Sequence, residues 1–215
     1  MVVKFSELKP KLDTGDLFLF SANFLISRII QVVTHSAYSH VGMVARYPDA
    51  DGKLCFWECT TFNQLVDKAD HELHSGVRLV SLDKLLAIYA NYVPGGFSVR
   101  LLKADRTPDF REAFANYVKL VDARPIANDL AMMARWMSGK MLSLTATDSS
   151  FFCSQLIAET YQRVGLLPEH RPPNAYAPKD FSMQNTNLQL LSGATLSEEI
   201  FVEWDGAKKT VAATA

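Results

Sequence analysis

The sequence predicts an α+β fold with a mainly antiparallel sheet. Three observations favour this class: strand-like apolar runs follow one another, two of them read as a hairpin, and the strongest helix-like segments come after them. A chain of 215 residues fits one domain of ordinary size. We expect a single domain at 1–204, followed by a disordered tail of small and polar residues at 205–215.

Short apolar runs between turn residues predict the strands. The run LFLF at 17–20 follows the turn sequence DTGD. Next come HVGMVARY at 40–47, a turn at 48–52 and the return run KLCFWECT at 53–60, which together read as a hairpin. Further strands are expected at 76–82, 97–102 and 198–204.

Apolar residues at helical spacing predict the helices. The expected segments are 22–33, 108–121 with a proline near its start, a piece at 128–137, and a last helix that runs from just after Ser150 to about Val164. Gly165 is the expected stop of the last helix, and Ser149 or Ser150 is its expected N-cap.

Composition excludes several classes of protein. The net charge of −1 gives no chain-wide attraction to nucleic acid or to an anionic membrane. Three cysteines, an odd number, argue against a disulfide scaffold and favour a reducing compartment. The N-terminus has no apolar signal core, and no run approaches the ~20 apolar residues of a membrane helix. We therefore expect a cytoplasmic protein, with delivery by a phage or a secretion system as the alternative.

Cys153 lies at the N-terminal end of the last predicted helix. In the first turn of a helix, unpaired amides and the helix dipole favour a thiolate, and the same amides can bind an oxyanion. Cys153 also shares one helical face with apolar residues such as Leu156 and Ile157, so a core cysteine is the alternative.

The hairpin supplies a histidine and a carboxylate. With the turn centred near Ala50, side-chain alternation puts His40, Gly42, Glu58 and Thr60 on one face. Glu58 lies in the apolar run LCFWEC, where a charge is costly unless it is paired, and Gly42 leaves room for it to lean toward His40. A glutamate that points to water is the alternative.

Five stretches of the chain carry a family resemblance: TGDLFLF, THSAYSHVGMV, FWECT, GVRLVSL and FFCSQLIAETYQRVG. They resemble permuted papain-like cysteine hydrolases of the NlpC/P60 superfamily, the YiiX/YebB-like group of amidases and peptidases, in which histidine precedes a polar residue and cysteine comes last. The resemblance covers about residues 13–180. It implies a catalytic domain with a barrel-like antiparallel sheet and hydrolysis of amide bonds, often in cell-wall or other unusual peptides.

The resemblance also implies roles. Cys153 would attack and form a thioester, His40 would move the proton, Glu58 would orient His40, and the backbone amide of Cys153 would serve the oxyanion hole. Residues expected to line the substrate site are Tyr38, Ser39, Thr60 and Ser154. No cofactor and no metal are expected, and the expected partner is a peptide or amide substrate. No pattern in the sequence indicates an oligomeric state.

Several alternatives stay open at this point. His35, five residues before His40, is the reserve candidate for the base. A lipid acyltransferase or thioesterase resembling lecithin–retinol acyltransferase uses the same thioester chemistry, although such relatives tend to carry a second histidine where Glu58 stands. A binding module without turnover is the remaining alternative.

Two further signals are set aside. HELH at 71–74 holds two histidines three residues apart, which is weak evidence for a metal site, so a solvated loop is expected. Cys55 and Cys59 are expected on the strand face opposite Glu58, with Cys59 turned away from the site.

Overall fold

The computed structural model describes residues 2–21, 36–47, 53–93, 97–125, 152–185 and 187–207. Several predictions lie outside these residues. They are the helices at 22–33 and 128–137, the hairpin turn at 48–52, the reserve base His35, the capping residues Ser149 and Ser150, and the tail from 208 onward.

A seven-stranded sheet forms the centre of the fold, with strand order β1-β9-β6-β2-β3-β4-β5. Its members are β1 (Val2–Lys4), β2 (Leu17–Phe20), β3 (His40–Arg46), β4 (Leu54–Thr60), β5 (Gly76–Ser81), β6 (Phe97–Arg100) and β9 (Ile200–Glu203). The pair β1–β9 is parallel and the other pairs of this sheet are antiparallel. A separate short pair joins β7 (Leu102–Lys103) to β8 (Thr195–Leu196). The predicted α+β class with a mainly antiparallel sheet is confirmed.

The hairpin has the predicted register. Met43 lies opposite Trp57 and Val44 opposite Phe56, so position 42 falls opposite position 58. The expectation that Gly42 leaves room for the Glu58 carboxylate is wrong, however. A Cβ atom at Gly42 would collide with the ring of Phe56, so the aromatic ring, not the Glu58 carboxylate, occupies the space that the glycine leaves.

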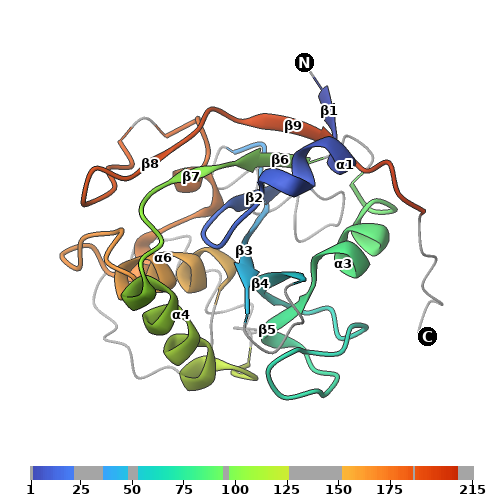
Figure 1. Cartoon of the computed structure of the whole chain (residues 1–215), viewed down its shortest axis with the longest axis horizontal. Coiled ribbons are helices and arrows are strands. Elements are labelled where there is room, and N and C mark those ends of the chain that lie inside the picture. The colour runs from blue at the N-terminus through green and yellow to red at the C-terminus, as the bar shows by residue number, and fades with distance from the viewer. Residues whose placement is uncertain are drawn as a thin grey trace.

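Helices cover both faces of the sheet (Figure 1). One face carries α4 (Pro108–Val121) and α6 (Cys153–Arg163), and the other carries α1 (Phe5–Leu8) and α3 (Leu82–Tyr89). Short 3₁₀ turns are η1 (Lys9–Lys11), η4 (Pro173–Ala175) and η5 (Pro178–Phe181). The predicted helix 108–121 is confirmed, and α1 and α3 are additions that the sequence pattern did not indicate. Within the described ranges, no helix is both long and apolar enough to cross a membrane.

Alternation along the strands builds two cores. Val41, Met43 and Trp57 face α4 and α6, whereas Val44 and Phe56 face α1 and α3. Each fully buried apolar side chain of this size contributes roughly 1.5–3 kcal/mol. Since β3 and β4 lie between the two cores, the side chains at their ends are held on a rigid support.

Candidate active site

Cys153 is the first residue of α6, as the sequence predicts for a first-turn cysteine. The N-cap is Phe152, whose backbone is extended and whose side chain makes no capping hydrogen bond, so the expected serine cap is wrong. The helix ends before Gly165, whose φ of 75° favours glycine, and the predicted stop is confirmed.

The surroundings of Cys153 favour a thiolate. Burial alone would raise the pKa of the thiol. A hydrogen bond from His40, the charge of that ring, and the backbone amides of Val41 and Ser154 outweigh burial and lower the pKa below its usual range. The sulfur therefore sits where a strand end and a helix N-terminus both present N–H donors.

His40 is the first residue of β3 and joins Cys153 to Glu58. Its Nε2 atom lies 2.8 Å from Oε2 of Glu58, which leaves Nδ1 for the sulfur of Cys153. Burial would lower the pKa of His40, but the hydrogen bonds with Cys153 and Glu58 raise it to about 10. The rings of Phe20 and Tyr89, with centroids 5.8 and 6.3 Å away, pack against the imidazole.

Glu58 is fully buried and accepts hydrogen bonds from three side chains. Its Oε2 atom accepts from His40 and from the Tyr89 hydroxyl at 2.9 Å, and Oε1 accepts from Nε and Nη2 of Arg78 at 3.1 and 2.7 Å. Burial would raise the pKa of Glu58, but the charge of Arg78 and the bond from His40 lower it to about 2. The alternative of a water-exposed glutamate is wrong, because Glu58 is fully buried and pairs with His40 and Arg78.

We call Cys153, His40, Glu58, Arg78 and Tyr89 the triad cluster. Sequence reasoning missed its last two members. The signal for Arg78 was present, since an arginine in the alternating apolar run GVRLVS points to a buried cation, and Arg78 lies directly opposite Glu58 in the β4–β5 register. Tyr89 lay on α3, which the pattern did not indicate.

The four residues expected to line the substrate site have these contacts. The Thr60 hydroxyl hydrogen-bonds Tyr89 and so touches the triad cluster. The Ser154 hydroxyl donates to the carbonyl of Tyr176 at 2.7 Å, while its amide faces the sulfur. The amide of Ser39 donates to the carbonyl of Phe20 at 2.9 Å. The Tyr38 hydroxyl bonds Ser98 and Glu199. Their contact with substrate stays a prediction.

None of the three cysteines forms a disulfide, and Cys55 and Cys59 lie on the sheet face opposite Glu58, as expected. Cys59 is nevertheless not remote from the site, which corrects the sequence prediction. That face is the one on which α6 packs, and burial together with the charge of Cys153 raises the pKa of Cys59 well above its usual value. Cys59 is thus a neutral neighbour of the Cys153 sulfur.

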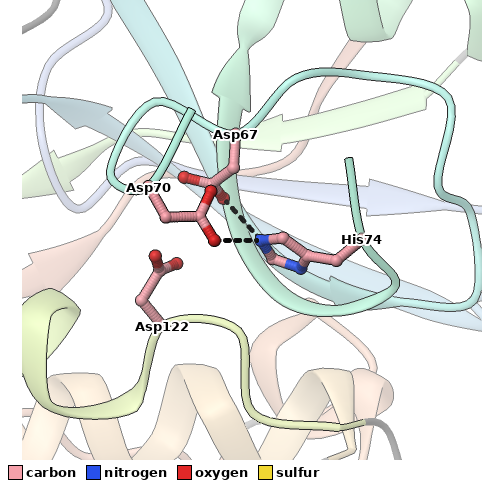
Figure 2. A group of neighbouring side chains, drawn as sticks. All are labelled: Asp67, Asp70, His74 and Asp122. Atoms are coloured by element: carbon pink, nitrogen blue, oxygen red, sulfur yellow. Dashed lines mark ion pairs between the residues drawn. The ribbon is translucent and has the colours of Figure 1, made fainter. Parts of the chain in front are cut away.

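A second group of side chains has the donor atoms for a metal ion. Asp67, Asp70, His74 and Asp122, which we call the Asp–His cluster, each bring one such atom to within 4.8 Å of the others (Figure 2). It shares no residue with the triad cluster, and of the HELH sequence it contains only His74.

No model of a known protein family matches the chain, and a search of curated proteins gave no match either. Among solved structures, the chain is similar to one described as "Crystal structure of metalloprotein yiiX from Escherichia coli O157:H7, DUF1105". The sequence identity is 18%, the match covers 88% of this chain and 88% of that chain, and the TM-score is 0.49. At this level of likeness, the chemistry of the site follows from this chain's own residues.

Proposed function

We propose that the chain is a cysteine hydrolase that cleaves amide or peptide bonds on a permuted papain-like fold. One observation carries the proposal: His40 hydrogen-bonds the first-turn thiol of Cys153 on one side and the fully buried Glu58 on the other. A nucleophile, a proton carrier and an orienting carboxylate in contact are the parts that thiol-dependent acyl transfer needs.

The first half-reaction begins with the thiolate of Cys153, which attacks the carbonyl carbon of the scissile amide. The carbonyl oxygen becomes an oxyanion, and the backbone N–H of Cys153 at the helix N-terminus is the donor we assign to it. The carbon–nitrogen bond then breaks, the imidazolium of His40 gives its proton to the leaving amine, and a thioester remains on Cys153.

The second half-reaction uses water. The now neutral His40 takes a proton from a water molecule, whose oxygen attacks the thioester carbon. The carbon–sulfur bond breaks, the acid product leaves, and the thiolate returns beside a protonated His40. Glu58 stays ionised throughout, because its partner Arg78 is a permanent cation, and it fixes the ring so that the other nitrogen faces the sulfur.

Thiol reactivity across pH tests the proposal directly. Iodoacetamide alkylation of Cys153, followed by mass spectrometry from pH 4 to pH 10, should proceed well below the usual thiol pKa of ~8.5. His40→Ala should move the midpoint up toward that usual value, since the ring and its charge are the main groups that lower the pKa of Cys153. The matched control is His170→Ala, which removes an exposed histidine.

Turnover gives the second measurement. Cys153→Ala should abolish hydrolysis of peptide amides while circular dichroism stays unchanged, and an electrophilic peptide should label wild type at Cys153 only. A parallel set of lipid ester substrates distinguishes an acyltransferase. An ordinary thiol titration in wild type, or hydrolysis retained by Cys153→Ala, would rule the proposal out.

A further inference from the structure

The Asp–His cluster joins two segments that are distant in sequence. Asp67, Asp70 and His74 lie in the irregular stretch between β4 and β5, and Asp122 is the C-cap of α4 (Figure 2). Backbone hydrogen bonds from Val77 to the carbonyl of Arg124, and from Ala123 to the carbonyl of Val77, hold these segments together. The side-chain donor atoms thus converge across the edge of the sheet.

Two atoms in this cluster are buried without a hydrogen-bond partner. They are Oδ1 of Asp122 and Nε2 of His74, which faces carboxylate oxygens of the cluster without a well-aligned hydrogen bond. Such an orphaned polar atom costs about 1–3 kcal/mol unless something binds it. Both residues belong to the set whose donor atoms converge within 4.8 Å, so a cation bound there would offer each of them a partner.

The state of His74 fits a metal ligand. Its Nδ1 lies 3.2 Å from the carbonyl oxygen of Ser75, and a carbonyl can only accept, so Nδ1 carries the proton. Its Nε2 faces Oδ2 of Asp70 at 3.2 Å and Oδ2 of Asp67 at 3.7 Å. A backbone carbonyl that fixes the tautomer in this way is the usual support of a metal-binding histidine.

The charge of the cluster is not balanced by the chain. Among the described residues, the ion pairs of these carboxylates are with His74, so three carboxylates face at most one positive charge. Asp67 is fully buried, where an uncompensated charge is most costly. In the triad cluster, Arg78 balances the buried carboxylate of Glu58, whereas in the Asp–His cluster Asp67 and Asp70 share the single imidazole of His74.

We propose that Asp67, Asp70, His74 and Asp122 bind one divalent transition-metal ion, with Zn²⁺ as the best fit. Carboxylate oxygens and one imidazole nitrogen are ordinary zinc ligands, and four of them complete a tetrahedron. Zinc bonds of about 2.0–2.1 Å place ligand atoms ~3.3 Å apart. The separations of 3.2 and 3.7 Å around Nε2 already lie near that value.

The ion would have a structural role. It would tie the segment between β4 and β5 to the end of α4, and Asp67 also accepts a hydrogen bond from the backbone of Leu79 in β5. Asp70 is the exposed member of the set and gives the ion a path from solvent. Since Arg78 precedes Leu79, the ion would also steady the strand that carries this member of the triad cluster.

Calorimetric titration of metal-stripped protein with ZnCl₂ tests the proposal. The titrations use the full chain carrying Cys153→Ala, which removes the Cys153–His40 pair as a second zinc site, so the result does not depend on catalysis. We expect one equivalent of Zn²⁺ and a rise in Tm of about 5 °C at saturation. MnCl₂, MgCl₂ and CaCl₂ are titrated in parallel to establish the preference among divalent ions.

Two variants and two controls keep the test decisive. Asp122→Asn and His74→Ala should abolish the zinc-dependent rise in Tm. In EDTA, the Tm of Asp122→Asn should equal or exceed that of the parent protein, because the substitution reduces repulsion between the carboxylates. Asp105→Asn and His170→Ala change exposed residues of the same types and should leave zinc binding intact. Absence of saturable one-to-one binding of Zn²⁺ and Mn²⁺, binding of Mg²⁺ or Ca²⁺ alone, or unchanged zinc binding by Asp122→Asn would overturn the proposal.

Discussion

The triad cluster and the Asp–His cluster each place a histidine among buried carboxylates, but they balance charge differently. In the triad cluster, Glu58 accepts from His40, Tyr89 and Arg78, and its pKa is lowered to about 2. In the Asp–His cluster, burial and the charges of Asp67 and Asp70 raise the pKa of Asp122 to about 7.

The comparison shows that the chain itself supplies the cation for Glu58. The carboxylates of the Asp–His cluster would instead take a cation or a proton from solvent. A buried carboxylate with an arginine partner is ionised at neutral pH and holds a neighbouring ring in one orientation. The carboxylates of the Asp–His cluster share one histidine instead, so a proton or an added cation would stabilise them further. Removing a charge should therefore have opposite effects on the stability of the two clusters.

Arg78→Met should give the largest loss of stability. The side chain is 1% exposed, and its removal leaves Glu58 buried without its cation. Breaking a buried pair on one side costs about 3–5 kcal/mol, which urea denaturation would measure as a lower midpoint. Hydrolysis should fall as well, since Glu58 would be protonated more readily and would hold His40 less firmly.

The matched control is Arg111→Met. That arginine pairs with Asp13 at 3.3 Å, and both side chains are substantially exposed. A surface pair contributes about 0–1 kcal/mol, so the control should shift the midpoint little. Equal losses for the two variants would contradict the view that Glu58 depends on its buried cation.

The second largest effect should come from acid, which should lower the stability that the triad cluster contributes to the fold. Because the folded pKa of Glu58 is about 2 against an ordinary value of 4.5, its contribution to stability is complete above about pH 4.5 and is lost as the pH falls toward 2. The loss amounts to about 3 kcal/mol.

Urea midpoints between pH 5 and pH 2 measure this loss. Glu58→Gln should start from a lower stability at neutral pH and should lack most of the acid-dependent decline. Glu112→Gln, at an exposed position, should keep the decline of wild type. If Glu58→Gln declined as steeply as wild type, other carboxylates would account for the acid sensitivity.

Those parts of the triad cluster that follow from period-two alternation were predictable from the sequence. The hairpin register put His40 beside Glu58, and helical spacing put Cys153 in a first turn. The N-cap was not predictable in the same way, because the extended backbone of Phe152 begins the helix without a capping side chain. Pattern reasoning identifies caps only where a side chain performs them.

The remaining residues depend on tertiary contacts with no short-range signal. Tyr89 comes from the eight-residue helix α3, which is too short for a clear period. Asp67 and Asp70 lie in an irregular stretch, and Asp122 joins them only because α4 ends against β5. The HELH sequence was set aside as a solvated loop, yet it contributes His74, though not His71, to the Asp–His cluster.

Tyr89→Phe should give the smallest effect, because it removes one of several donors to Glu58 and keeps the packing of the ring. Burial and the charge of Glu58 raise the pKa of the Tyr89 hydroxyl well above its usual value, so it is a neutral donor at every working pH. Loss of one hydrogen bond to a charged group costs about 1.5–3 kcal/mol, and we expect the lower end because Arg78 still balances the carboxylate.

The useful readout for Tyr89→Phe is the alkylation profile of Cys153. If Tyr89 positions Glu58 and through it His40, the midpoint of alkylation should move up slightly, by less than in His40→Ala. Tyr92→Phe is the matched control, since that residue packs on the same Phe62 ring and the change likewise removes one phenolic hydroxyl. A loss of stability in Tyr89→Phe with an unmoved alkylation midpoint would limit the Tyr89 hydroxyl to stabilising the buried Glu58 carboxylate, and the orienting of His40 would then rest on Glu58 and Arg78.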